Sequence, residues 1–166
     1  MSITIPDGLP RLAAGSHQRG SGKACAMNYV SYINGDVRIT DEPHNVNREL
    51  ARHARHVNDI ICPCIGDTIC GDCSGVLLRA IPRLIGTGPL PSLKNTELRH
   101  RLREAREDIL PLYTILGVGH LTRRAACEAF LNRALEIYAE LGGEQTTTIT
   151  GADMTAAAES IKVGVA

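Results

Sequence analysis

The clearest hydrophobic pattern in the chain lies between residues 96 and 116. Apolar side chains recur there at alternating spacings of four and three residues: Leu98, Leu102, Ala105, Ile109, Leu112 and Leu116. Because an α-helix repeats every 3.6 residues, this spacing places them on one helical face. Asn95 or Thr96 is suited to cap the start, and Pro111 should kink or split the helix. The pattern predicts an amphipathic helix with one face packed against the rest of the protein.

Further segments also have the length and patterning of helices: residues 24–33, 48–61, 74–85, 122–141 and, more briefly, 150–162. Asn47 can cap the second of these. A strand competes with the helix at residues 24–33, because tyrosine and β-branched side chains favour extended structure. Residues 145–150 form the best strand candidate. We therefore predict an all-α or nearly all-α fold, a compact bundle of five to six helices.

The domain organisation follows from length and from the distribution of Gly and Pro. Residues 1–22 contain several of both and predict an irregular N-terminal arm. Residues 23–166 fit a single helical domain. Hydrophobic residues make up 43% of the chain but aromatic residues only 3%, so the core should consist mainly of Leu, Ile, Val and Ala.

Charge and hydropathy narrow the functional classes. Lys plus Arg equals Asp plus Glu, at 18 each, which argues against a generally basic nucleic-acid-binding protein. No segment approaches the roughly 18 to 20 apolar residues that span a bilayer, so we expect no membrane partner. Residues 1–10 have no apolar core typical of a secretory signal. These features predict a cytoplasmic protein whose six cysteines are reduced thiols or metal ligands.

Four of the cysteines lie within twelve residues of one another: Cys62, Cys64, Cys70 and Cys73. Thiolates bind Zn²⁺ tetrahedrally, and two pairs on tight turns can close such a site. The single residue between Cys62 and Cys64 is an unusual spacing, so His56 on the preceding helix is a possible substitute ligand. The cluster predicts a structural zinc site, with an iron–sulfur cluster as the less favoured occupant of the same cysteines.

Two other interpretations of the cysteines stay open. Cys70 and Cys73 enclose Gly71-Asp72 just before a predicted helix, and a helix N-terminus lowers the pKa of a thiol. This arrangement is similar locally to a thioredoxin-type motif, although no strand–helix–strand pattern surrounds it. The cysteines could also be small buried apolar side chains. Metal binding is favoured, because four thiols cluster in one Gly-rich loop.

Arginine gathers on two of the predicted helices. Arg99, Arg101, Arg103 and Arg106 lie on one of them, and Arg48, Arg52 and Arg55 lie on the other. Either group could contact phosphates. Glutamate interrupts the first group, and the chain has few aromatic side chains to stack on bases, which favours ordinary solvated helix faces. Nucleic-acid binding through Arg99, Arg101, Arg103 and Arg106 is therefore an alternative and not the preferred function.

The first half of the chain, up to Cys73, resembles a group of small uncharacterised proteins from actinobacteria and their phages. The resemblance lies in residues 8–12, 22–31, 35–36, 50–51 and 57–59. It implies an origin in the cytoplasm of a bacterial host cell and brings no catalytic residues with it. Paired carboxylates placed for acid–base chemistry are not evident in the sequence.

Taken together, these features favour a non-enzymatic interaction or regulatory protein with a structural zinc site and a protein partner. A phage effector acting on a host protein is one form of this function. A nucleic-acid-binding regulator that uses the Arg-rich helix faces is an alternative. A thiol–disulfide redox protein that uses Cys70 and Cys73 is another.

Overall fold

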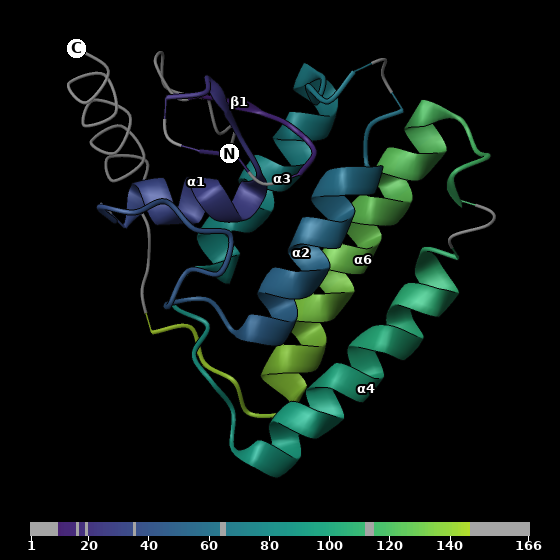
Figure 1. Ribbon diagram of the computed structural model, residues 1–166. Coiled ribbons are helices and arrows are strands. Elements are labelled where there is room, and N and C mark those ends of the chain that lie inside the picture. The colour runs from purple at the N-terminus through teal and green to yellow at the C-terminus, as the bar shows by residue number, and fades with distance from the viewer. Residues whose placement is uncertain are drawn as a thin grey trace.

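The computed structural model describes residues 10–15, 17–18, 20–34, 36–63, 66–111 and 115–146 (Figure 1). This part of the chain contains five named helices, α1 (Ala26–Ile33), α2 (Arg48–Ile60), α3 (Gly71–Leu84), α4 (Ser92–Ile109) and α6 (His120–Glu140). Two short strands, β1 (Arg11–Leu12) and β2 (Lys23–Ala24), pair in parallel. The prediction of a nearly all-α fold is confirmed.

Local capping explains where several helices begin and end. Asn47 precedes α2, and its Oδ1 accepts hydrogen bonds from the backbone N–H groups of Glu49 and Leu50, at 3.0 and 3.4 Å. Residues 26–33 form a helix and not the competing strand. After α6, Gly142 adopts a φ of +85°, a left-handed conformation that glycine reaches without strain. These sequence signals therefore act as expected.

Several helix boundaries differ from the prediction, and two of the differences matter most. The third helix begins at Gly71 rather than residue 74, so Cys73 lies in its first turn. The fourth ends at Ile109, before Pro111, which breaks the predicted apolar stripe. Leu98 and Leu102 are fully buried, whereas Leu116 lies beyond the helix and is 52% exposed. Of the two effects expected of Pro111, a kink or a split, the helix shows no kink through the proline and is interrupted before it.

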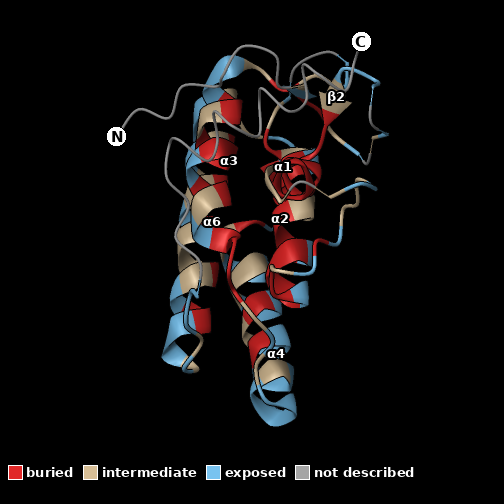
Figure 2. Cartoon of the chain, turned by 90° about the vertical axis from the view of Figure 1, so that its left-hand side faces the viewer, coloured by how far each residue is buried: buried red, intermediate tan, exposed pale blue. Residues whose placement is uncertain are grey.

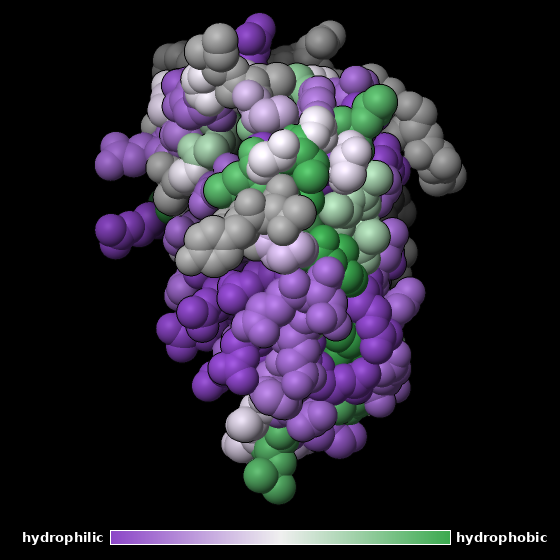
Figure 3. All heavy atoms as spheres, turned by 90° about the vertical axis from the view of Figure 1, so that its right-hand side faces the viewer, coloured by the Kyte–Doolittle hydropathy of each residue, from purple (hydrophilic) through white to green (hydrophobic). Residues whose placement is uncertain are grey.

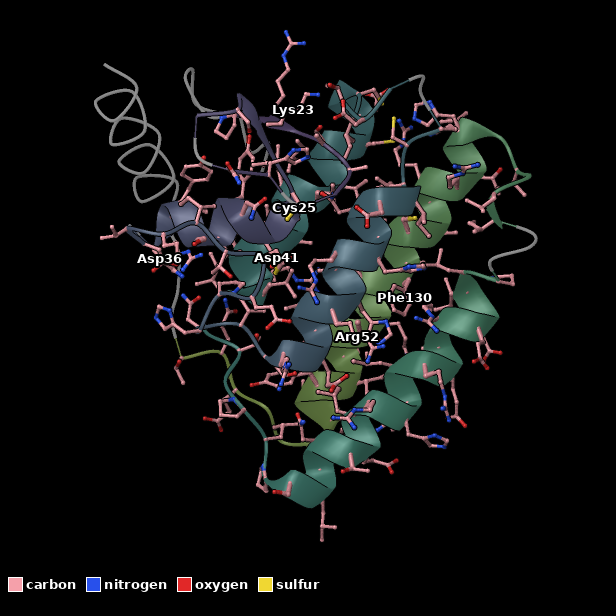
Figure 4. All side chains as sticks on the ribbon, viewed as in Figure 1. Lys23, Cys25, Asp36, Asp41, Arg52 and Phe130 are labelled. Atoms are coloured by element: carbon pink, nitrogen blue, oxygen red, sulfur yellow. The ribbon has the colours of Figure 1, made fainter. Side chains whose placement is uncertain are left out.

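The core forms where α1, α2, α3, α4 and α6 pack together. Figure 2 shows α1 as almost wholly buried. Phe130 of α6 packs edge-on against His53 of α2, with ring centroids 5.6 Å apart (Figure 4). Burial, with the charges of Arg106, His56 and Arg52, lowers the pKa of His53 to about 4. The face over α4 is mainly hydrophilic (Figure 3), so this helix covers one side of the core.

The N-terminal segment is integrated with the helical body. The backbone N–H of Ala14 donates to Asp67 O at 2.8 Å, and that of Ile69 donates to Leu12 O at 2.9 Å. Asn58 of α2 accepts a hydrogen bond from Ala26 N–H at 3.0 Å and donates to Ala13 O at 2.8 Å. Residues 12–14 therefore support the chain that leads directly into Cys70.

The end of the described chain returns to the body near α3. Gln145 forms an isolated antiparallel bridge with Thr87. The rest of the predicted strand, residues 147–150, and the predicted helix over 150–162 lie outside the described residues, as does the arm up to residue 9. Among the helices that the structure describes, none has the length and apolar character needed to cross a membrane.

Candidate metal centre

Four side chains with metal-ligating atoms converge at one end of the molecule: Cys62, Cys70, Cys73 and His120. One ligand atom from each lies within 4.8 Å of the other three. Cys73 is buried, and the other three side chains are partly exposed. The group combines one residue that follows α2, two residues at the start of α3 and one at the start of α6.

Helix ends position the four residues. Cys62 follows the C-terminal end of α2, Cys70 is the N-cap of α3, and His120 is the first residue of α6. Cys73 lies three residues after Cys70, which places both on the same side of the first turn of α3. Figure 1 shows the end of α2 and the starts of α3 and α6 at the same end of the molecule.

The distances centre the group on the imidazole of His120. Its Nε2 lies 2.9 Å from Cys73 Sγ and 3.4 Å from Cys70 Sγ. The backbone N–H of Cys70 donates to Cys62 Sγ at 3.5 Å, a contact that orients this sulfur and stabilises negative charge on it. All four residues are therefore linked by direct contacts.

The surroundings of Cys73 disfavour a free thiolate at this sulfur. Burial raises the pKa of the Cys73 thiol, and a hydrogen bond with Cys70 and the neighbouring charges of Cys62 and Cys70 raise it further. Three thiolates this close repel one another unless a cation lies between them. A bound cation reverses this effect, because a coordinated thiol is deprotonated outright.

The size and chemistry of the group suit one metal ion. Metal–sulfur bonds of about 2.3 Å in a tetrahedron separate the ligand atoms by about 3.8 Å. The observed limit of 4.8 Å is about 1 Å wider, a difference that small side-chain rotations can close. Three thiolates and one imidazole also make up a coordination set common in structural zinc sites. These residues can hold a metal ion.

The group matches the sequence-based prediction only in part. Cys62, Cys70 and Cys73 come together, whereas Cys64 lies outside the described residues. The histidine in the group is His120 and not His56. His56 lies on α2, where burial and the positive charge of Arg106 lower its pKa. The sequence allowed for three cysteines and one histidine, and the histidine that lies with the three cysteines is His120.

His120 was missed because it lies 47 residues from Cys73 in the chain. The sequence carries only a faint signal, since His120 lies between Gly119 and residue 122, where the predicted helix begins. Two further cysteines lie elsewhere in the core. Burial raises the pKa of Cys25, and it raises that of Cys127 to about 12, so neither is an activated nucleophile.

The arginines predicted as a nucleic-acid interface are largely engaged within the protein. Arg99 Nε donates to Glu49 Oε1 at 2.8 Å, and Arg101 forms an ion pair with Glu140. Arg103 contacts the imidazole of His100 at 3.1 Å. These contacts account for three of the four side chains. They fit the interpretation of this surface as a solvated helix face.

Comparisons with known proteins place the chain in no family. The chemistry of the four clustered residues therefore rests on their own geometry and burial. No protein-family model, curated protein or solved structure matches this chain.

Proposed function

We propose that this chain is a non-enzymatic interaction or regulatory protein whose surface is held in place by a structural Zn²⁺. The observation that carries the proposal is the convergence of Cys62, Cys70, Cys73 and His120 within 4.8 Å. These residues come from the ends of three helices. A metal ion at this point cross-links α2, α3 and α6.

The ligand set favours Zn²⁺ over Ca²⁺, Mg²⁺ and an iron–sulfur cluster. Three soft thiolates and an imidazole suit Zn²⁺, while Ca²⁺ and Mg²⁺ prefer oxygen ligands. Iron–sulfur clusters usually take four cysteine ligands. The compact group of four atoms also fits a single ion better than a cluster with several metal atoms.

The number of ligands favours a structural role. Four protein ligands complete a tetrahedral zinc site, whereas catalytic zinc keeps one position open for water or substrate. Metal binding to a closed site adds directly to folding free energy. Zinc at this position therefore stabilises the turn from α2 to α3 and the start of α6.

Apolar side chains beside the centre support an interaction role. Leu116 and Leu121 flank His120 in the chain and are 52% and 71% exposed. A zinc ion that fixes His120 also fixes these neighbours, which lowers the entropic cost of docking a partner on them. The resemblance of the first half to actinobacterial and phage proteins favours a phage effector whose partner is a host protein.

The redox alternative has less support than metal binding. Nucleophilic thiol chemistry requires a thiolate, and burial raises the pKa of Cys73. Both sulfurs contact Nε2 of His120, at 2.9 Å for Cys73 and 3.4 Å for Cys70, so small side-chain shifts would let the three atoms bind one ion. We therefore propose coordination, and not disulfide exchange, as the role of Cys70 and Cys73.

Metal analysis of matched histidine variants tests this function. Protein purified without added metal or chelator should contain about one zinc per chain, as one closed tetrahedral site requires. His120→Ala should lose most of this zinc, because only three ligands stay in place. His56→Ala should keep it, because His56 is outside the group. Full zinc content in His120→Ala, or equal loss in both variants, would contradict the proposed site.

A further inference from the structure

A cleft rich in arginine lies at the opposite half of α2 from the cysteine–histidine group. It has a volume of about 400 Å³ and is lined by Glu42, Arg48, Glu49, Arg52, Arg55 and Arg99. Arg48, Arg52 and Arg55 repeat at helical spacing along α2, and Arg99 reaches the cleft from α4. Figure 4 labels Arg52 on α2. The two arginine-bearing helices therefore meet at one concave surface.

The charges in this cleft are only partly balanced. Four guanidinium groups and two carboxylates line the cleft, and Asp41 adds a third carboxylate through its ion pair with Arg55, which leaves a formal excess of one positive charge. Arg55 pairs with Asp41 at 3.2 Å and with Glu42 at 3.5 Å. Arg48 and Arg52 are exposed, and neither forms an ion pair or hydrogen bond within the described ranges. Two guanidinium groups are therefore available to an anion.

The carboxylate of Glu49 holds Arg99 in place through one oxygen and has no partner in the described part of the chain at the other. Its side chain is 6% exposed, and its Oε1 accepts a hydrogen bond from Arg99 Nε at 2.8 Å. This bond engages only the Nε of Arg99 and orients the terminal N–H groups. Glu49 Oε2 is buried without a partner among the residues described. Buried carboxylate oxygens normally accept a hydrogen bond, so the site lacks a donor such as a hydroxyl group.

A second hollow adjoins the first and shares Glu42 and Arg48 with it. Its volume is about 540 Å³, and its lining includes apolar Pro43, Val46 and Pro89 together with polar His44 and Asn95. Small-molecule sites combine apolar walls with a few polar groups in this way, at volumes of about 300 to 1,000 Å³. The pair of hollows therefore fits a ligand with a charged end and a neutral organic end.

We propose that this double cleft binds a small phosphate monoester that carries hydroxyl groups, such as a sugar phosphate. Arg48, Arg52 and Arg99 contact the phosphate dianion, because Arg48 and Arg52 have no carboxylate partner of their own among the described residues and guanidinium groups bind phosphate oxygens in bidentate geometry. A ligand hydroxyl donates to Glu49. The organic part lies in the second hollow against Pro43, Val46 and Pro89. This site is separate from the metal centre and does not depend on zinc.

The cleft suits a small molecule better than a nucleic acid. Single-stranded nucleic acids are held by aromatic platforms along extended basic grooves, and neither hollow is lined by an aromatic ring from Phe or Tyr. Glu42 lines both hollows and would repel a continuous phosphate backbone. A single phosphate avoids this repulsion, because it can bind on the arginine side alone.

Calorimetric titration of the full chain tests the proposal, with ribose 5-phosphate, inorganic phosphate and ribose as probes. The ionic strength is held constant, because salt screens exposed charges. Ribose 5-phosphate should bind about tenfold or more tightly than inorganic phosphate, since only it reaches both hollows. Ribose should not bind measurably. Arg52→Gln should lower the affinity for ribose 5-phosphate about tenfold or more, which corresponds to the loss of one charged contact.

Two variants serve as controls. Arg83→Gln removes the same charge from α3, where Arg83 contacts Asn132, and should leave the affinity within about twofold. His44→Ala should lower the affinity for ribose 5-phosphate but not that for inorganic phosphate, because His44 lines only the second hollow. If Arg52→Gln and Arg83→Gln lowered the affinity for ribose 5-phosphate equally, the proposal would be overturned, since the net charge of the protein would then explain binding. No binding of ribose 5-phosphate, or equal affinity for inorganic phosphate, would also overturn it.

Discussion

Cys73→Ser is expected to lower the melting temperature of the zinc-loaded protein by about 10 °C. Cys73 is the buried member of the metal-ligating group, and serine is a poor zinc ligand. Zinc present at about a thousand times its dissociation constant stabilises the folded state by about 4 kcal/mol. For a chain of this length, each kcal/mol shifts the melting temperature by about 2 to 4 °C. Loss of the site therefore produces a shift that thermal unfolding readily detects.

A chelator separates the loss of zinc from damage to the core. Excess chelator should lower the melting temperature of the wild type by about the same amount, and it should leave Cys73→Ser nearly unchanged. Cys127→Ser provides the matched control, because Cys127 is equally buried but lies outside the group. It should lose some stability through its buried hydroxyl and still respond to chelator. A melting temperature of the wild type that does not change with excess chelator would contradict a structural zinc.

Asn58→Ala is expected to reduce the free energy of unfolding by about 4 kcal/mol. Asn58 is 1% exposed and serves two buried backbone groups, the N–H of Ala26 and the carbonyl of Ala13. Alanine leaves both without their partner, and each unsatisfied buried group costs about 1 to 3 kcal/mol. The Ala26 N–H belongs to the first turn of α1 and has no partner within that helix.

Urea unfolding measures this effect. The midpoint should fall while the dependence on urea stays constant, because the folded surface is unchanged. Asn132→Ala is the control, since Asn132 accepts only an exposed hydrogen bond from Arg83. It should cost less than about 1 kcal/mol. Similar losses in the two variants would show that Asn58 does not join the N-terminal segment to α1 and α2.

The fold class was predictable because its signals are local. The spacing of Leu98 and Leu102 fixed the buried face of α4, and Asn47 marked the start of α2. The parallel pairing of β1 with β2 gave no comparable signal, since each strand has only two residues. Its register depends on contacts such as that of Asn58 with Ala13, which join residues 45 positions apart. Sequence periodicity carries no information about such contacts.

The group of Cys62, Cys70, Cys73 and His120 also divides into residues that the sequence indicated and one that only the fold brings near. Cys62, Cys70 and Cys73 lie close together in the chain, so their density alone indicated a site. His120 joins them only because α6 packs beside α3 and begins at the same end of the molecule. His56 was the nearer histidine in sequence, but it lies outside the group, and burial and the charge of Arg106 lower its pKa. Proximity along the chain was therefore a poor guide to which histidine lies beside the three cysteines.

X-ray absorption at the zinc edge tests the central claim most directly, because it reports the atoms bound to the metal. Three sulfur ligands at about 2.3 Å and one nitrogen at about 2.0 to 2.1 Å are expected from Cys62, Cys70, Cys73 and His120. In His120→Ala the nitrogen contribution should disappear, and in His56→Ala it should persist. A shell of four sulfurs, or a nitrogen that survives in His120→Ala, would contradict the proposed centre.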